Sequence, residues 1–103
     1  MNEIFKKAHE ASDFLKLLAN PNRLAILCCL LEKECNVSEL HQAIGMSQAG
    51  TSNQLAMLRR AGLIVAEVKH RQRVYRIVDE KTRAVLGVLH GFYCAVPENK
   101  NRP

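Results

Sequence analysis

The chain has 103 residues, of which 48% are hydrophobic and 5% aromatic, and its formal net charge is +5. This length predicts a single domain spanning residues 1–103. No apolar run approaches the roughly 20 residues that cross a bilayer, and the first ten residues lack the apolar segment of a signal peptide, so we expect a cytoplasmic protein with reduced thiols. The absence of Trp disfavours a stacking surface for single-stranded nucleic acid.

Helical periodicity begins near the N-terminus. Apolar residues recur there at spacings of three and four, which predicts an amphipathic helix: Ile4, Ala8, Ala11, Leu15 and Leu18. The Asn20-Pro21-Asn22 sequence interrupts this helix, because the residue before a proline is biased away from helical backbone. A nearly all-apolar helix is then predicted over residues 24–31.

Two further helices are predicted in the middle of the chain, separated by a glycine. Ser38 can cap a short helix over residues 39–44, and Gly45 supplies its end and the turn. Ser47 can cap the next helix, which we expect to run to Ala61. One stripe of that helix is expected to face the core because its residues are spaced by four and three: Thr51, Leu55 and Leu58.

The hydrophobic period then changes from helical to extended. Residues 63–68 and 74–78 are rich in β-forming side chains, and residues 69–73 between them are mostly basic. This pattern predicts a β-hairpin with a basic tip, although no Asn-Gly or Asp-Gly fixes the turn type. Asp79 can cap a last helix that runs to about Cys94, and residues 97–103 are expected to fray.

The positive charge is concentrated in one short stretch. Six Lys and Arg residues and a single acidic residue lie between Arg59 and Arg76, so this stretch accounts for the whole net charge. Such a localised excess is typical of a surface that binds a polyanion. The alternative interpretation is a solvated hairpin that happens to be basic.

The order of elements predicts a mainly α fold with a small β-hairpin wing, namely a winged helix-turn-helix of five helices. The second helix of such a pair enters the DNA major groove by its N-terminal residues. Polar side chains at that end can contact base edges, and the basic residues can contact phosphates. Each of them can equally be a cap or an ordinary solvated residue. The predicted DNA-binding residues are Ser47, Gln48, Ser52, Asn53, Gln54, Arg59, Lys69, His70, Arg71 and Arg73.

Four runs carry a resemblance to a known family. LANPNRLAIL (residues 18–27), VSEL (37–40), GMSQ (45–48) and QLAMLRRAGL (54–63) resemble the ArsR/SmtB family of bacterial repressors. The resemblance extends from about residue 10 to about residue 95. It implies a homodimer that packs through its first and last helices, and a non-enzymatic repressor that an inducer releases from a double-stranded DNA operator.

The metal-sensing residues of that family do not match this chain. Where its arsenic and cadmium sensors carry Cys-Val-Cys, this chain has Asn36-Val37-Ser38. Where its zinc sensors carry four ligands on the last helix, the matching positions are Asp79, Lys81, Phe92 and Ala95. The resemblance therefore implies no metal at either place, and no cofactor is expected.

The dithiol sensors of persulfides and oxidants in the same family are a closer match. Their two cysteines lie in the second helix and near the end of the last, and Cys28 and Cys94 occupy these positions. The resemblance implies that a reactive sulfur species joins these two thiols by a disulfide or polysulfide. His90 lies four residues before Cys94 and can either take the thiol proton or be a surface residue.

Several alternatives stay open at this point. Cys29 is expected to pack in the core, whereas Cys35 is expected to be exposed and could be an auxiliary thiol. A soft metal site built from Cys28, Cys35 and Cys94 would make the protein a metal-responsive repressor. The protein could also act by antagonising another DNA-binding protein. A redox enzyme is disfavoured, because the chain has no C-x-x-C pair and no cofactor motif.

Overall fold

The computed structural model describes residues 2–94 and contains five helices and three short strands. The helices are α1 (Glu3–Leu18), α2 (Pro21–Glu32), α3 (Val37–Ile44), α4 (Gln48–Arg60) and α5 (Glu80–Tyr93). The strands are β1 (Cys35–Asn36), β2 (Ile64–Lys69) and β3 (Gln72–Ile77). The predicted order of five helices and a hairpin is therefore confirmed. The expected fraying of residues 97–103 lies outside the described residues.

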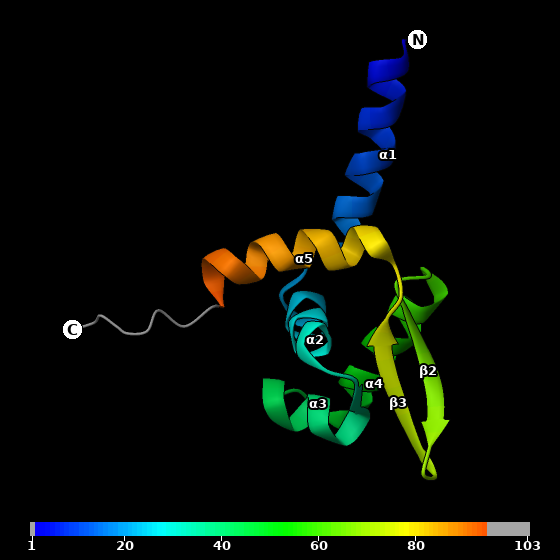
Figure 1. Ribbon diagram of the computed structural model, residues 1–103, viewed down its shortest axis with the longest axis vertical. Coiled ribbons are helices and arrows are strands. Elements are labelled where there is room, and N and C mark those ends of the chain that lie inside the picture. Colours follow the sequence, from blue (N-terminus) through cyan, green and yellow to red (C-terminus); the bar gives the residue numbers. More distant parts are fainter. Residues whose placement is uncertain (1, 95–103) are drawn as a thin grey trace, which may run out of the picture.

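The core lies where α2 packs against α3, α4 and α5. Ile26 and Leu27 of α2 are fully buried, and Leu86 of α5 is 1% exposed. The predicted inner stripe of α4 is confirmed, since Thr51, Leu55 and Leu58 are all buried. Figure 1 shows α5 lying across α2 above this core, while α1 projects away from the body of the molecule.

Two helix starts differ from the sequence expectation. The second helix begins at Pro21 rather than residue 24, because the Asn20 side chain accepts hydrogen bonds from the backbone N–H groups of Asn22 and Arg23. The third helix is capped by Asn36, and the proposed Ser38 cap is wrong. Asn36 Oδ1 accepts from the Glu39 N–H at 2.8 Å, and Glu39 Oε1 accepts from the Asn36 N–H at 2.9 Å.

The hairpin belongs to a three-stranded antiparallel sheet. The strand order is β1-β3-β2, and Cys35 of β1 is paired with Tyr75 of β3. The sequence did not predict β1, which has only two residues and therefore no readable alternation. It connects the end of α2 to the wing, so the wing is fixed to the helical body at its inner strand.

The tip of the wing is tighter than predicted. The strands extend to Lys69 and Gln72, which are paired, so His70 and Arg71 form the whole turn. Both have positive φ angles, 50° and 68° respectively. This is the left-handed region in which non-glycine residues are disfavoured. The turn therefore holds two basic-type side chains at the end of the hairpin at some cost in backbone energy.

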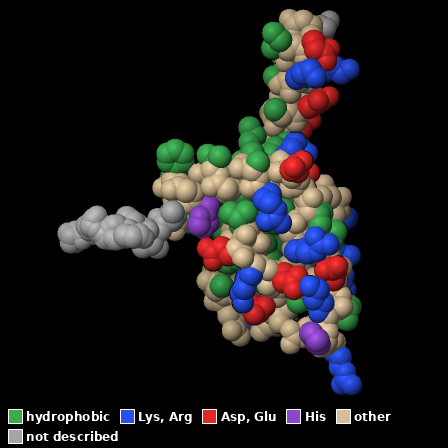
Figure 2. Space-filling model, viewed as in Figure 1, with side chains coloured by type: hydrophobic (Ala, Val, Ile, Leu, Met, Phe, Trp, Pro, Cys, Tyr) green, Lys and Arg blue, Asp and Glu red, His purple; other side chains and the backbone are tan. Residues whose placement is uncertain are grey.

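The surface of α1 and α5 is apolar at many positions. Hydrophobic side chains gather along both helices in Figure 2, and Phe92 and Tyr93 are more than 80% exposed. Within residues 2–94 no single helix is long and apolar enough to cross a membrane. Helices α1 and α2 reach the required length and apolar composition only when they are counted as one segment, and that segment is bent by 86°.

Candidate DNA-binding surface and dithiol site

The N-terminal end of α4 presents small polar side chains to solvent. Ser47 caps the helix, as predicted, because its Oγ accepts a hydrogen bond from the Gly50 N–H at 2.9 Å. Gln48, Ser52 and Asn53 are exposed to solvent. Their geometry allows contact with base edges, and their role in reading DNA stays a prediction.

Gln54 is held by another helix rather than presented to solvent. The Arg23 Nε of α2 donates to Gln54 Oε1 at 3.1 Å, and the two side chains are partly buried. A second Arg23 nitrogen donates to the Leu17 carbonyl of α1 at 3.2 Å. This Arg23 clamp joins the ends of α1 and α2 to the middle of α4. The contact with DNA predicted for Gln54 stays untested, but its side-chain oxygen already has a partner.

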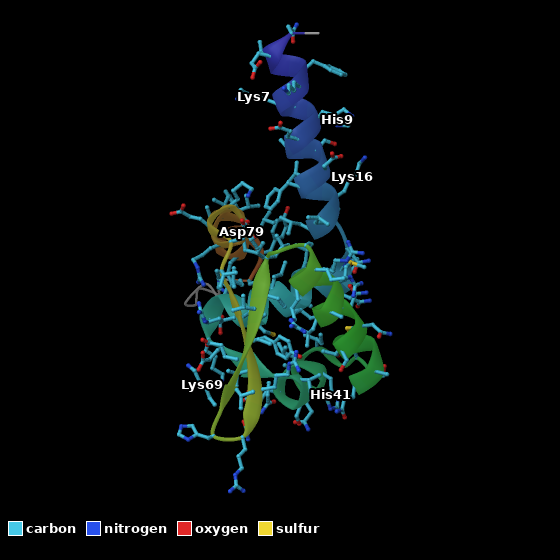
Figure 3. The ribbon with its side chains drawn as sticks, turned by 90° about the vertical axis from the view of Figure 1, so that its right-hand side faces the viewer. Lys7, His9, Lys16, His41, Lys69 and Asp79 are labelled. Carbon is cyan, nitrogen blue, oxygen red and sulfur yellow. The ribbon has the colours of Figure 1, made fainter. Side chains whose placement is uncertain are left out.

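The wing carries both paired and unpaired cations. Lys69 donates to the Glu34 carboxylate at 2.9 Å, and Figure 3 shows Lys69 on the hairpin, far from Lys7 and Lys16 on α1. A surface pair of this kind contributes little to stability because water and salt screen it, so a phosphate can compete for Lys69. Arg71 and Arg73 are exposed and make no ion pair within residues 2–94. Both guanidinium groups are therefore open to an anion from solution.

The structure brings together the two cysteines that the resemblance selected. Cys28 lies on α2, Cys94 lies at the C-cap of α5, and their Sγ atoms are 3.3 Å apart. Both are free thiols, and either can donate to the other. Burial first, and then the hydrogen bond and charge of Cys94, raise the pKa of the Cys28 thiol to about 11. Cys28 is therefore protonated near neutral pH.

A second polar contact joins the same two helices one turn away. Glu32 lies four residues after Cys28, and His90 lies four residues before Cys94. The His90 Nε2 and Glu32 Oε2 atoms are 3.1 Å apart. His90 therefore pairs with a carboxylate rather than with a thiol. Glu32 was not among the residues predicted from the sequence, although its spacing from Cys28 places the two side chains on one helical face.

The remaining thiols do not join this site. Cys29 is half-buried beside the core, in line with the expected packing role. The expectation that Cys35 is exposed is wrong, because Cys35 is paired in β1 and only 5% exposed. Its Sγ donates to the Lys33 carbonyl at 3.4 Å. Among residues 2–94, no group of three His, Cys, Asp or Glu side chains is arranged to hold a metal ion, so the three-thiolate alternative has no geometric support.

A helix-turn-helix followed by a basic hairpin defines a winged-helix DNA-binding regulator. Residues 20–65 match the family described as bacterial regulatory protein, arsR family. A biofilm growth-associated repressor of Xylella fastidiosa is 37% identical over 90 residues, which cover 87% of this chain and 79% of that protein. The chain belongs to the arsR family of regulatory proteins, and it is therefore not an enzyme.

Two solved structures agree with this assignment. The crystal structure of the transcriptional repressor BigR from Xylella fastidiosa superposes with a TM-score of 0.85 at 34% identity, covering 96% of this chain and 97% of that one. Reduced HlyU from Vibrio cholerae superposes with a TM-score of 0.84 at 36% identity, covering 92% and 100%. By sequence, the transcriptional activator HlyU of Vibrio cholerae is 36% identical over 91% of this chain and 87% of its own length.

Proposed function

We propose that this chain is a homodimeric repressor that leaves its operator when a reactive sulfur species joins Cys28 to Cys94. The DNA-binding fold follows from the family, whereas the inducer, the dimer and the residues that touch DNA are proposals. A cytoplasmic location, which the sequence predicts, would keep both thiols reduced until such a species appears.

One observation carries the sensor proposal. The two thiols are 66 residues apart in the chain and come from different helices, yet their Sγ atoms are in contact at 3.3 Å. A contact of this kind lets the second thiol capture an intermediate formed on the first without a large movement of either helix. Cys29 and Cys35 are each beside other partners and lack this arrangement.

The chemistry needs no oxidant beyond the sulfur species itself. The Cys28 thiolate attacks the outer sulfur of a persulfide RSSH, so Cys28 becomes a persulfide and RSH leaves. The Cys94 thiolate then attacks Cys28 Sγ, forms a disulfide and releases hydrogen sulfide. The two protein thiols are oxidised and the outer sulfur is reduced to sulfide. The high pKa of Cys28 keeps its thiolate fraction low and so favours strongly electrophilic sulfur.

The bridge would act on DNA binding by locking the contact between α2 and α5. A ligand or crosslink changes affinity only when the two functional states differ in how they accommodate it. The operator-bound arrangement must therefore hold the two sulfur atoms apart or in another orientation. Because α2 also carries the Arg23 clamp to α4, a fixed α2–α5 contact would restrict how α4 is presented to the major groove.

The dimer proposal rests on the apolar surface of the two outer helices. Large exposed hydrophobic side chains occur on α1 and α5: Ile4, Phe5, Leu15, Val88, Phe92 and Tyr93. Their burial against a second copy would remove this surface from water. A two-fold dimer would present two copies of α4 to half-sites spaced by whole turns of DNA.

The test combines mass spectrometry with DNA titration on the same sample. Glutathione persulfide should crosslink Cys28 to Cys94 and weaken operator binding, and dithiothreitol should restore it. Cys28→Ser and Cys94→Ser should bind DNA like the wild type but lose the response. Cys29→Ser is the matched control, since it alters the neighbouring half-buried thiol on α2. A response that persists in the Cys28→Ser/Cys94→Ser protein would refute the proposal.

A second candidate function is antagonism of another DNA-binding protein. One relative is named a transcriptional activator, and a protein of this fold can raise transcription by displacing a repressor from an overlapping site. The two functions differ in a competition experiment on the chain's own promoter. Antagonism requires that transcription rises when the reduced protein binds, whereas repression requires that it falls.

A further inference from the structure

A cavity opens beside the two thiols, between α2 and α5. Its volume is about 400 Å³, and the Cys28 and Cys94 side chains form part of its wall. The other lining residues are all apolar or aromatic: Leu24, Ala25, Leu86, Leu89 and Tyr93. A reagent that reaches the sulfur atoms through this cavity therefore meets hydrocarbon on the remaining sides.

We propose that this cavity selects uncharged, apolar carriers of sulfane sulfur, such as dialkyl trisulfides, over anionic carriers such as glutathione trisulfide. This proposal deepens the proposed function and rests on it, since it assumes that the dithiol is the reacting group. It adds the class of molecule that delivers the sulfur.

The charges around the cavity support this choice. Among the described residues, no Lys, Arg or His side chain lines it, so the carboxylates of a glutathione carrier would lose water without gaining a cation partner there. The Glu32 carboxylate lies one turn along α2 from Cys28. Its charge adds to the causes that raise the pKa of Cys28 and would repel an anion. An apolar carrier instead gains by burial against the leucine side chains.

The reaction balances with a trisulfide RSSSR and no other reagent. The Cys28 thiolate attacks the central sulfur, forms Cys28–S–S–S–R, in which the first sulfur is Cys28 Sγ, and releases RS⁻. The Cys94 thiolate then attacks the transferred sulfur, the atom next to Cys28 Sγ, and releases the second RS⁻. The product is Cys28–S–S–S–Cys94, and the two leaving thiolates take up the two thiol protons. The protein dithiol is oxidised, and the carrier is reduced to two thiols.

The experiment compares dimethyl trisulfide with glutathione trisulfide on the full-length reduced protein. Each rate of Cys28–Cys94 crosslinking is divided by the rate of the same carrier with N-acetylcysteine amide, which removes the difference in intrinsic reactivity. We expect the normalised rate to favour dimethyl trisulfide by at least about tenfold, from excluding the charged carrier. Equal rates, or a preference for glutathione trisulfide, would overturn the proposal while leaving the dithiol switch intact. Absence of crosslinking by both trisulfides, while glutathione persulfide still crosslinks the thiols, would also overturn this proposal alone. Absence of crosslinking by all three reagents would instead overturn the proposed function.

Variants at the cavity wall make the test independent of the carriers' size. Leu89→Lys adds a cation beside the sulfur atoms and should raise the relative rate of glutathione trisulfide by several-fold. Leu89→Gln is the matched neutral control and should leave the preference unchanged. Because Leu89 is partly buried, Ala25→Lys serves as a second variant at a lining position on α2 that lies outside the proposed dimer surface. Preferences that do not respond to the added cation at either position would also overturn the proposal.

Discussion

The distance between the two thiols predicts which bridge forms when sulfur is delivered. The Cys28 and Cys94 Sγ atoms are 3.3 Å apart in the reduced protein. A disulfide bond is about 2.05 Å long, so direct oxidation must draw these atoms together by about 1.3 Å. In a trisulfide, two such bonds at an angle near 107° place the outer sulfur atoms about 3.3 Å apart. A single inserted sulfur therefore spans the observed gap without moving either Sγ atom.

The perturbation is treatment of the reduced protein with excess glutathione persulfide, which can yield either bridge. One equivalent leads to the disulfide with release of hydrogen sulfide. A second equivalent converts Cys94 to a persulfide, and the two protein persulfides then combine to Cys28–S–S–S–Cys94 with release of hydrogen sulfide. Conversion of the dithiol to a trisulfide adds about 30 Da, whereas a disulfide removes about 2 Da. We expect the trisulfide to be the main product, measured on intact protein and on the crosslinked peptides that contain Cys28 and Cys94. Diamide delivers no sulfur and can form only the disulfide. It should therefore oxidise the Cys28–Cys94 pair more slowly than it oxidises a model dithiol.

The result that would refute this reasoning is a predominant disulfide after persulfide treatment. It would mean that α2 and α5 approach each other by more than about 1 Å as easily as they stay in place. The distance between the Sγ atoms in the reduced protein would then not select the product. Cys29→Ser again serves as the control, because exchange with the neighbouring thiol could shorten the bridge. If the disulfide predominates in both proteins, the geometric argument fails.

Four other outcomes are expected. Burial and the contact with Cys94 raise the pKa of Cys28 to about 11. The rate of Cys28 alkylation, measured by peptide mass spectrometry, should therefore rise about tenfold per pH unit above about pH 9 and level off near pH 11. A plateau near pH 9 would contradict the raised pKa. For the same reason the free energy of unfolding should fall as pH rises through that range, since the folded state holds its proton more tightly. Asn36→Ala should lower the free energy of unfolding by about 1 kcal/mol in urea, through loss of the α3 cap, whereas Ser38→Ala should not. Arg71→Asn, which suits the left-handed turn but removes a charge, should reduce the slope of log Kd against log salt by about 1; an unchanged slope would place the tip away from phosphate.

The sequence predicted the elements well where a pattern repeats over many residues. The inner stripe of α4 and the cap at Ser47 were both found from spacing and residue type. The cap at Asn36 was missed because a serine two residues further along satisfied the same rule. The choice between them depends on β1, whose two residues pair with β3 and extend the backbone just before the helix. A long-range strand partner of this kind leaves no local pattern.

The candidate site was predictable only in part. The family resemblance selected Cys28 and Cys94, but neither composition nor spacing indicates that residues on two helices have their sulfur atoms in contact. Gln54 shows the same limit. Its position in the second helix of the pair predicts a DNA contact, which stays a prediction. Its side-chain oxygen also accepts a hydrogen bond from Arg23, 31 residues away, which no helical periodicity could reveal.

The Arg23 clamp is strong enough to take part in the proposed switch. Release of a repressor by a factor of about 100 requires a coupling free energy of about 2.7 kcal/mol. A hydrogen bond from a charged donor contributes about 1.5–3 kcal/mol, and the bond between Arg23 and Gln54 is of this type. Loss or distortion of this one contact is therefore comparable with the whole effect required.

The position of the clamp on α2 gives it a route to the dithiol. Arg23 and Cys28 are five residues apart on one helix, about 7.5 Å along its axis, so a bridge that keeps α2 from moving to its operator-bound position also restrains the guanidinium group. Gln54→Ala should then weaken operator binding of the reduced protein by about tenfold or more, with little change in preference among operator sequences. The same substitution should also reduce the further loss of operator affinity that bridging causes, because part of that loss has already occurred. An additive effect of Gln54→Ala and the bridge would show that the signal reaches α4 by another path.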